Sequence, residues 1–135
     1  MSMRSFHLDV VTPDGAIYSG EVESLLVRTD TGDIEFLAGH IDYIASLGTG
    51  RARIREGGRD RYASVSGGTI QISGGKASLV AVTFEFKENI DIERARAAKS
   101  RAEEKIKAAK SDRELVLAKA RLERAISRIK VYELK

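Results

Sequence analysis

The sequence changes its character at Ile90-Asp91-Ile92-Glu93-Arg94-Ala95. All twelve glycines lie at or before Gly75, whereas residues 91–135 contain neither glycine nor proline. Glycine serves tight turns and weakens helices, so this division predicts a strand-rich domain of residues 1–87 and a helical domain of residues 88–135. Asp91 is a suitable helix N-cap, and Ile90 can pack on the first turn. The same charged stretch can also hold a ligand.

The first domain is divided by three glycine pairs, Gly57-Gly58, Gly67-Gly68 and Gly74-Gly75. The short segments between them alternate in character, which is typical of hairpins whose turns need positive φ angles. A longer strand is predicted by apolar residues at every second position, which are Val80, Val82, Phe84 and Phe86, with Leu79 and Ala81 on its other side. Many short strands without a helical stripe predict an all-β antiparallel sandwich or flattened barrel.

The second domain carries two narrow apolar stripes at spacings of three and four residues. The first contains Ala95, Ala98, Ala102, Ile106 and Ala109, and the second contains Leu115, Ala118, Leu122, Ala125, Ile129 and Tyr132. A capping-box pattern from Ser111 to Glu114 stands between them, so we expect an antiparallel helical hairpin. Alanine buries little apolar surface, and the hairpin is therefore expected to be marginally stable alone and to dock on the strand domain, a partner or a ligand.

Composition narrows the protein class. The sequence has no cysteine, which rules out disulfides and thiolate zinc sites, and no window reaches the roughly 20 apolar residues of a membrane span. Its start has no apolar core like that of a signal peptide, so we expect a soluble protein or one peripheral to a membrane. Residues 1–90 carry net charge −3 and residues 91–135 carry +6. The basic segment suits nucleic acid, anionic lipid, a nucleotide or an acidic protein surface.

Residues that carry catalysis or bind metal are scarce. Only His7 and His40 are histidines, and neither stands at a catalytic or metal-binding spacing, so no catalytic residue and no metal ligand is predicted. Gly75-Lys76-Ala77 resembles part of a phosphate loop, but residue 70 is Ile where that motif requires Gly. Nucleic-acid binding is not predicted, because Tyr132 is the single aromatic residue of the basic segment and acidic residues interrupt the basic run.

The arginines of the helical domain are placed more regularly. Arg94 and Arg101 are seven residues apart on the first predicted helix, and Arg124 and Arg128 are four apart on the second. In a hairpin both pairs can converge near a helix N-terminus, which suits a polyphosphate. The alternative is a solvated basic face that forms surface ion pairs with neighbouring glutamates. Spacing alone leaves both interpretations open.

The order of several motifs resembles that of the epsilon subunit of bacterial rotary ATP synthase, over the whole chain. These motifs are Val10-Val11-Thr12-Pro13-Asp14-Gly15, Gly39-His40, Ser66-Gly67-Gly68 and Ile90-Asp91-Ile92-Glu93-Arg94-Ala95. The resemblance implies a non-catalytic rotor subunit of a proton- or sodium-translocating ATP synthase. It implies that the strand domain binds the gamma subunit and the c-ring, and that the hairpin folds down or extends to the alpha/beta catalytic hexamer and obstructs ATP hydrolysis. It also implies a peripheral position on the cytoplasmic side of the cell membrane.

The resemblance further implies an ATP site. Some members of that family bind ATP through an Ile/Leu-Asp-x-x-Arg-Ala motif, which Ile90, Asp91, Arg94 and Ala95 match. Four other residues occupy the family's remaining contact positions, namely Glu85, Arg101, Arg124 and Arg128. ATP is thus expected as a regulatory ligand, and no obligatory cofactor is expected.

The expected c-ring loop departs from the family. Members usually carry Gly-x-x-Gly-x-x-Pro-Gly-His-x-Pro, whereas residues 32–42 here have Glu35 in place of the second Gly and lack both prolines. The resemblance carries over the location of the contact, at Asp33, His40 and Asp42, but not its geometry. A rival interpretation is a stand-alone ligand-binding β-sandwich with a helical tail that docks a partner. It predicts a concave pocket within residues 1–87.

Overall fold

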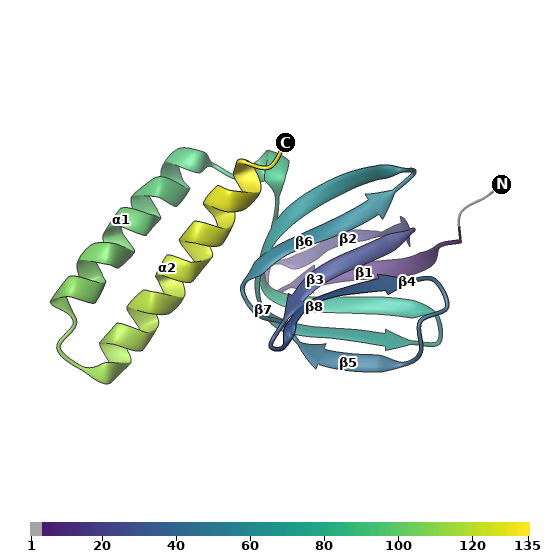
Figure 1. The fold of residues 1–135 in the computed structure, drawn as a ribbon, viewed down its shortest axis with the longest axis horizontal. Coiled ribbons are helices and arrows are strands. Elements are labelled where there is room, and N and C mark those ends of the chain that lie inside the picture. Colours follow the sequence, from purple (N-terminus) through teal and green to yellow (C-terminus); the bar gives the residue numbers. More distant parts are fainter. Residues whose placement is uncertain (1–3) are drawn as a thin grey trace.

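The computed structural model describes residues 4–135, which form an eight-stranded β-sandwich followed by a two-helix hairpin (Figure 1). The fold predicted from the sequence is confirmed. The strands are β1 (Phe6–Thr12), β2 (Gly15–Val22), β3 (Ser24–Thr29), β4 (Gly32–Leu37), β5 (Tyr43–Ser46), β6 (Gly50–Glu56), β7 (Arg59–Ser73) and β8 (Lys76–Phe86). A short 3-10 helix, η1 (Lys87–Asn89), leads to α1 (Ile92–Ala108) and α2 (Asp112–Tyr132).

The two layers of the sandwich are parts of one continuous sheet in the order β2-β1-β8-β7-β6-β3-β4, with β5 also paired to β7. The first part of β7 pairs with β6 and its last part pairs with β5, so the β7–β8 hairpin belongs to both layers. All of these strand pairs are antiparallel except β1 and β8, which run parallel. An antiparallel arrangement was predicted throughout, and this one pair corrects it.

The β7–β8 hairpin changes its buried side at Gly67-Gly68, where both φ angles are positive. Before this point the odd-numbered Val65 faces the core, and after it the even-numbered Ile70 does. Since side chains alternate along a strand, β7 has exchanged its buried side. Strand β8 changes in the same way. Val80 and Val82 are 51% and 61% exposed, whereas Phe84 and Phe86 are buried. The sequence placed these four on one face, and the bend explains why only the last two reach the core.

The bend leaves polar side chains on the outer face of β7 and β8. Ser64 lies opposite Glu85 in the strand register, and Ser66 lies opposite Thr83, to which its hydroxyl hydrogen-bonds at 2.8 Å. Both serines are nearly buried although they point away from the core. This outer face is the surface that meets the helical hairpin.

The hairpin begins and ends as the sequence predicts. The Asp91 carboxylate accepts a hydrogen bond from the Arg94 backbone N–H at 3.2 Å, and the Ser111 hydroxyl accepts one from the Glu114 N–H at 3.1 Å. The seam between the helices is thin, since its buried residues are alanines, namely Ala95, Ala102, Ala118 and Ala125. Tyr132, expected in this seam, is 42% exposed.

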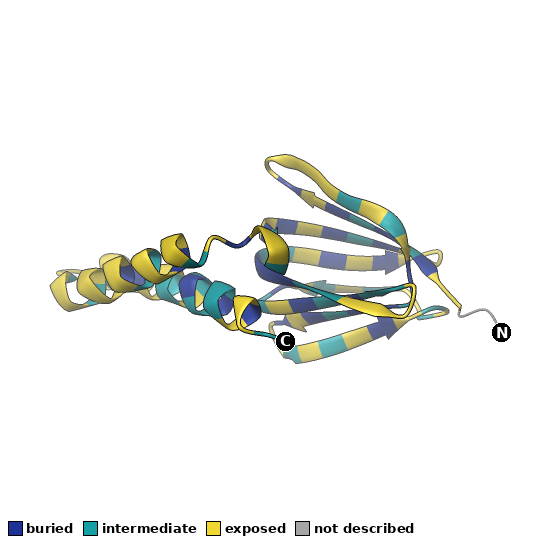
Figure 2. Ribbon diagram, turned by 90° about the horizontal axis from the view of Figure 1, so that it is seen from above, coloured by how far each residue is buried: buried dark blue, intermediate teal, exposed yellow. Residues whose placement is uncertain are grey.

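Figure 2 shows that the tip of the hairpin is largely exposed. Neither α1 nor α2 is apolar enough over its length to span a bilayer.

The bend predicts a specific sensitivity at Gly68. A Cβ atom there would stand 1.9 Å from the Val80 carbonyl oxygen at a φ of +108°. Gly68→Ala is therefore expected to lower the free energy of unfolding by roughly 3 to 5 kcal/mol, from backbone strain and overpacking together. Gly74→Ala is the matched control, because its φ is also positive but its Cβ meets no atom within 4 Å. It should cost about 1 to 2 kcal/mol. Chemical denaturation measures both, and equal costs would contradict the role of the bend.

Candidate functional site

Helix α2 joins the hairpin to the sandwich, where it contacts β7, β6 and η1. The Ser127 hydroxyl lies 2.8 Å from the Ser64 hydroxyl in a buried hydrogen bond, and Val131 is 1% exposed beside it. The Arg128 Nε donates to a carboxylate oxygen of Glu85 at 2.8 Å. Ser127 and Val131 lie outside the stripe predicted from the sequence, because that stripe marks the seam with α1 rather than the face turned to the sandwich.

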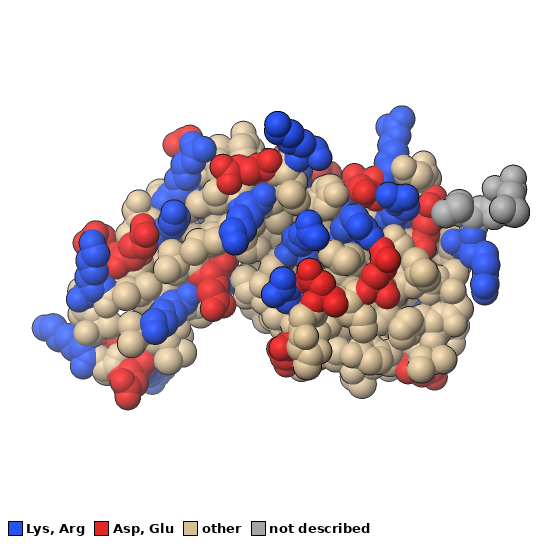
Figure 3. Space-filling model, viewed as in Figure 1, with Lys and Arg blue, Asp and Glu red and all other residues tan. Residues whose placement is uncertain are grey.

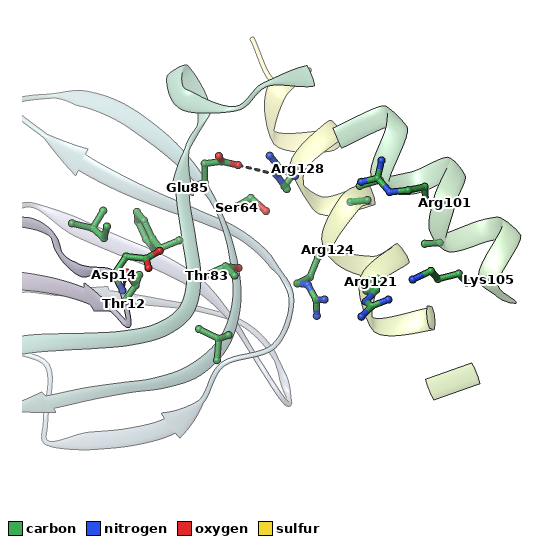
Figure 4. A pocket seen from close by; sticks show the side chains of 16 residues that line it. Thr12, Asp14, Ser64, Thr83, Glu85, Arg101, Lys105, Arg121, Arg124 and Arg128 are labelled. Carbon is green, nitrogen blue, oxygen red and sulfur yellow. Dashed lines mark hydrogen bonds and ion pairs between the residues drawn. The ribbon is translucent and has the colours of Figure 1, made fainter. Parts of the chain in front are cut away.

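A cleft of about 600 Å³ opens between the hairpin and the outer face of β8 (Figure 4). Its hairpin wall is basic, because besides three alanines it is lined by Arg101 and Lys105 on α1 and by Arg121, Arg124 and Arg128 on α2. The sandwich wall carries two carboxylates, Asp14 and Glu85, and three hydroxyls, those of Thr12, Ser64 and Thr83. Lys and Arg side chains stand over both helices and near their junction with the sandwich, mixed with carboxylates (Figure 3). The cleft therefore has the charge and the hydrogen-bonding groups to hold an anion with a polar appendage.

Four residues of the predicted ATP site meet in this cleft. They are Glu85 from β8, Arg101 from α1, and Arg124 and Arg128 from α2. Arg124 and Arg128 are one helical turn apart, so they share a face. Arg128 is already neutralised by Glu85, whereas Arg101 and Arg124 have no ion-pair partner among residues 4–135.

The other four predicted residues lie at the base of the hairpin and do not line the cleft. Ile90 and Ala95 are 6% and 0% exposed, so they pack inside the structure. Asp91 caps α1, and Arg94 is exposed on its first turn. Arg94 nevertheless belongs to the stripe of α1 that continues through Ala98 and Arg101, because the spacings are four and three. It therefore extends the row of basic residues beyond the cleft toward η1.

Two basic cleft residues were not predicted. Lys105 follows Arg101 by four residues, and Arg121 precedes Arg124 by three, so each continues a stripe already identified. The helical spacing was a usable signal for both. The family motif does not include either residue.

The connection from β8 through η1 to α1 is held from the sandwich side by Arg61. Its guanidinium lies 3.9 Å from the centroid of the Phe86 ring and donates to the Glu88 carboxylate at 2.7 Å. This hydrogen bond from Arg61 is the main cause that holds the pKa of Glu88 below its ordinary value. The charged pair thus fixes η1, from which α1 departs.

The residues predicted as one c-ring loop are divided in the structure. His40 and Asp42 lie in the loop between β4 and β5, at the end of the sandwich opposite the hairpin (Figure 1). The His40 ring packs edge-on against Phe36 at 4.9 Å, and Asp42 accepts a hydrogen bond from the Gly74 N–H at 3.3 Å. Asp33 stands at the other end of β4, where it pairs with Arg28 at 2.7 Å.

A second cleft, of about 780 Å³, lies on the other side of α2. It is bounded by Arg28, Asp33 and Arg51 from the sandwich and by residues of the last turns of α2. The sandwich alone forms a hollow of about 10 Å³ near His40, which is too small for the ligand that the rival interpretation requires. Within residues 4–135 no group of three or more His, Asp and Glu side chains is placed to hold a metal ion.

Comparison with known proteins gives matches over nearly the whole chain. The sequence model described as "ATP synthase, Delta/Epsilon chain, beta-sandwich domain" matches residues 5–87, and the one described as "ATP synthase, Delta/Epsilon chain, long alpha-helix domain" matches residues 88–133. The ATP synthase epsilon chain of Bacillus velezensis is 36% identical over 129 residues, covering 96% of this chain and 98% of the relative. That of Caldanaerobacter subterraneus is 39% identical, covering 95% and 94%.

Solved structures share the fold. A chain in the mitochondrial ATP synthase of Euglena gracilis superimposes with a TM-score of 0.77 at 24% identity, covering 91% of this chain and 79% of that one. A chain in the central stalk and c-ring of the Tetrahymena thermophila enzyme gives a TM-score of 0.63 at 12% identity, covering 98% and 99%. At these identities the likeness concerns the fold alone.

The contacts of α2 predict how the hairpin is held. Ser64→Ala leaves the buried Ser127 hydroxyl without its partner, which costs roughly 1 to 3 kcal/mol. Because the docked hairpin depends on this contact, amides of α1 and α2 are expected to exchange about tenfold faster, while those of the sandwich core keep their protection. Hydrogen exchange measures this, and Ser100→Ala on the exposed side of α1 is the control. Unchanged exchange in the helices would show that this hydrogen bond does not fasten the hairpin.

Proposed function

This chain belongs to the delta/epsilon family of ATP synthase, whose epsilon chain is a non-catalytic subunit, and we propose that it is a regulatory rotor subunit. It couples rotation of the central stalk to the c-ring of a proton- or sodium-translocating enzyme. Its C-terminal hairpin senses ATP and restrains ATP hydrolysis. The observation that carries the proposal is the cleft in which Glu85, Arg101, Arg124 and Arg128 meet between hairpin and sandwich.

A movable hairpin is supported by how little holds it. Its seam buries alanines, and its specific contacts with the sandwich lie in the second half of α2, at Ser127, Arg128 and Val131. Loss of these few contacts releases the whole hairpin, because α1 is carried by α2. The energy difference between docked and released forms is therefore small enough for a ligand to shift.

An ATP site is supported by the division of charge in the cleft. Arginines donate forked hydrogen bonds to phosphate oxygens, and the α2 wall offers Arg124 and Arg128 on one face. Glu85 and the hydroxyls of the sandwich wall are suited to the adenosine part. Arg94 extends the basic row toward η1, while Ile90, Asp91 and Ala95 build the helix start that positions Arg101.

A ligand that needs both walls stabilises the docked hairpin by mass action. The gain is RT ln(1 + [L]/Kd), which is about 2.7 kcal/mol when the ligand exceeds Kd a hundredfold. This is comparable to the contribution of a few side-chain contacts at the docking surface. ATP abundance thus becomes a signal that keeps the hairpin folded and the alpha/beta hexamer free of it.

The surface proposed for the c-ring lies at the end of the sandwich opposite the hairpin. Ile41 in the loop of His40 and Asp42 is 78% exposed, and Leu37 at the adjoining end of β4 is 56% exposed, which suits contact with the c-ring. Asp33 is too far along β4 to share this contact, so we assign the c-ring contact to the loop alone. The sandwich binds the gamma subunit, and the assembly holds the chain peripherally at the cytoplasmic face of the cell membrane.

Calorimetric titration with ATP tests the ligand. The full chain is expected to bind ATP, and Arg124→Gln is expected to weaken binding at least tenfold because it removes a charge-assisted hydrogen bond. Arg113→Gln removes the same charge from an exposed position on α2 outside the cleft and should bind like the parent chain. Equal affinities of the two variants would place ATP elsewhere, and no heat of binding to the parent chain would remove the ligand from the proposal.

Reconstitution tests the regulatory role. The full chain is compared with residues 1–87 alone in an assembly of catalytic hexamer and gamma subunit. Deletion of the hairpin is expected to raise ATP hydrolysis severalfold, most clearly at low ATP, because the released hairpin no longer obstructs the hexamer. Binding of both forms to the gamma subunit serves as the control for folding. Equal hydrolysis rates, with both forms bound, would contradict inhibition by the hairpin.

A further inference from the structure

The cleft continues past the four predicted ATP-site residues that line it. One helical turn nearer the tip of the hairpin, Lys105 on α1 and Arg121 on α2 also line it. Figure 4 shows Arg128 beside Glu85 at one end of the cleft and Arg121 and Lys105 toward the other end. Arg121 and Arg128 are seven residues apart, which is about 10 Å along the helix axis at 1.5 Å per residue.

Lys105 and Arg121 form the distal pair of the cleft, and both charges are unpaired among the residues that the structure describes. Among residues 4–135, Lys105 and Arg121 form no ion pair within 4.0 Å, whereas Arg128 at the other end is paired with Glu85. The carboxylate of Asp14 belongs to the opposite wall of the cleft and reaches neither. Cations placed on both helices at one end of a cleft repel each other, and a shared anion removes that repulsion.

We propose that Lys105 and Arg121 form a second anion subsite, which makes this cleft a receptor for polyphosphate chains longer than a triphosphate. The inference rests on the proposed function, since it takes the proximal arginines as the first phosphate contacts. A chain that lies along the stripes of α1 and α2 meets Arg128 first, then Arg101 and Arg124, and finally the distal pair. The fourth phosphate group of a tetraphosphate is the group that reaches them.

The competing explanation is that the distal pair belongs to a solvated basic face. Ordinary surface charges then attract any polyanion through the summed electrostatic potential of the hairpin. The contribution of each charge to polyanion affinity does not depend on its position on the hairpin. Position is therefore the property to test. Lys107 on α1 and Arg113 on α2 offer the comparison, since both are exposed cations of the same helices outside the cleft.

Titration calorimetry on the full chain decides between them. The ligands are sodium tripolyphosphate and sodium tetrapolyphosphate, with ATP and adenosine 5′-tetraphosphate as the nucleoside-linked pair. The parent chain is expected to bind each tetraphosphate about tenfold more tightly than the corresponding triphosphate, the gain of one additional charge-assisted contact. In K105Q/R121Q this ratio is expected to fall below about twofold, with triphosphate affinity nearly kept. In K107Q/R113Q the ratio should stay near tenfold.

Each outcome bears on the subsite. A ratio near one in the parent chain, or an equal fall of the ratio in both double variants, overturns it while leaving ATP binding intact. Triphosphates that fail to bind the parent chain overturn the proximal site and the subsite together. A gain confined to adenosine tetraphosphate supports the subsite and identifies its occupant as nucleoside-linked. Thermal denaturation without ligand supplies the folding control, because removal of unpaired like charges from K105Q/R121Q should not lower Tm.

Discussion

The hairpin depends on the sandwich because its two helices bury too little apolar surface against each other. The buried residues of the seam are alanines, and one buried methyl group contributes only about 0.8 kcal/mol, against roughly 1.5 to 3 for a Val or Leu side chain. Most of the stability of a helix in a protein comes from the tertiary packing of its apolar face. The docking contacts at Ser127, Arg128 and Val131 therefore decide whether the hairpin is ordered. Since all three lie in the second half of α2, the hairpin is held from its base, and its tip extends freely.

The surface that receives α2 exists because β7 and β8 bend. Ser64 and Ile70 have the same parity along β7, yet Ser64 faces α2 and Ile70 faces the core. This exchange of faces needs a backbone that changes direction within two residues, which Gly67 and Gly68 permit through their positive φ angles. The same bend brings Glu85 to the outer face, opposite Ser64. One local conformational feature thus places both the polar docking pair and the acidic partner of Arg128.

The sequence predicted the features that depend only on interactions between residues close together in the chain. Helix caps at Asp91 and Ser111 and the alanine stripes need only neighbours within four residues, and all are present. The parallel pairing of β1 with β8 joins strands far apart in the chain, and no local periodicity encodes it. Asp33 is separated from His40 for another reason, because residues 32–37 form a strand that pairs with β3 and buries Phe36 fully. The sequence spacing predicted that Arg124 and Arg128 are neighbours on one face of a helix. It could not predict that Asp91 lies outside the cleft, because this depends on the point along α1 at which the helix first comes opposite the sheet.

Charge and packing act in opposite directions on the docked hairpin. Arg121, Arg124 and Arg128 form one row on α2, and like charges at spacings of three and four weaken a helix by a few tenths of a kcal/mol per pair. Docking places this row against Arg101 and Lys105, and the sandwich supplies Glu85 as the one carboxylate that pairs with it among residues 4–135. An anion in the cleft converts this repulsion into attraction. Because ligand binding and docking are linked, each then stabilises the other by the same free energy. The thin seam keeps the competing energies small, so under the proposed function an excess of cations with few internal partners is a means of making the docked state depend on a polyanion.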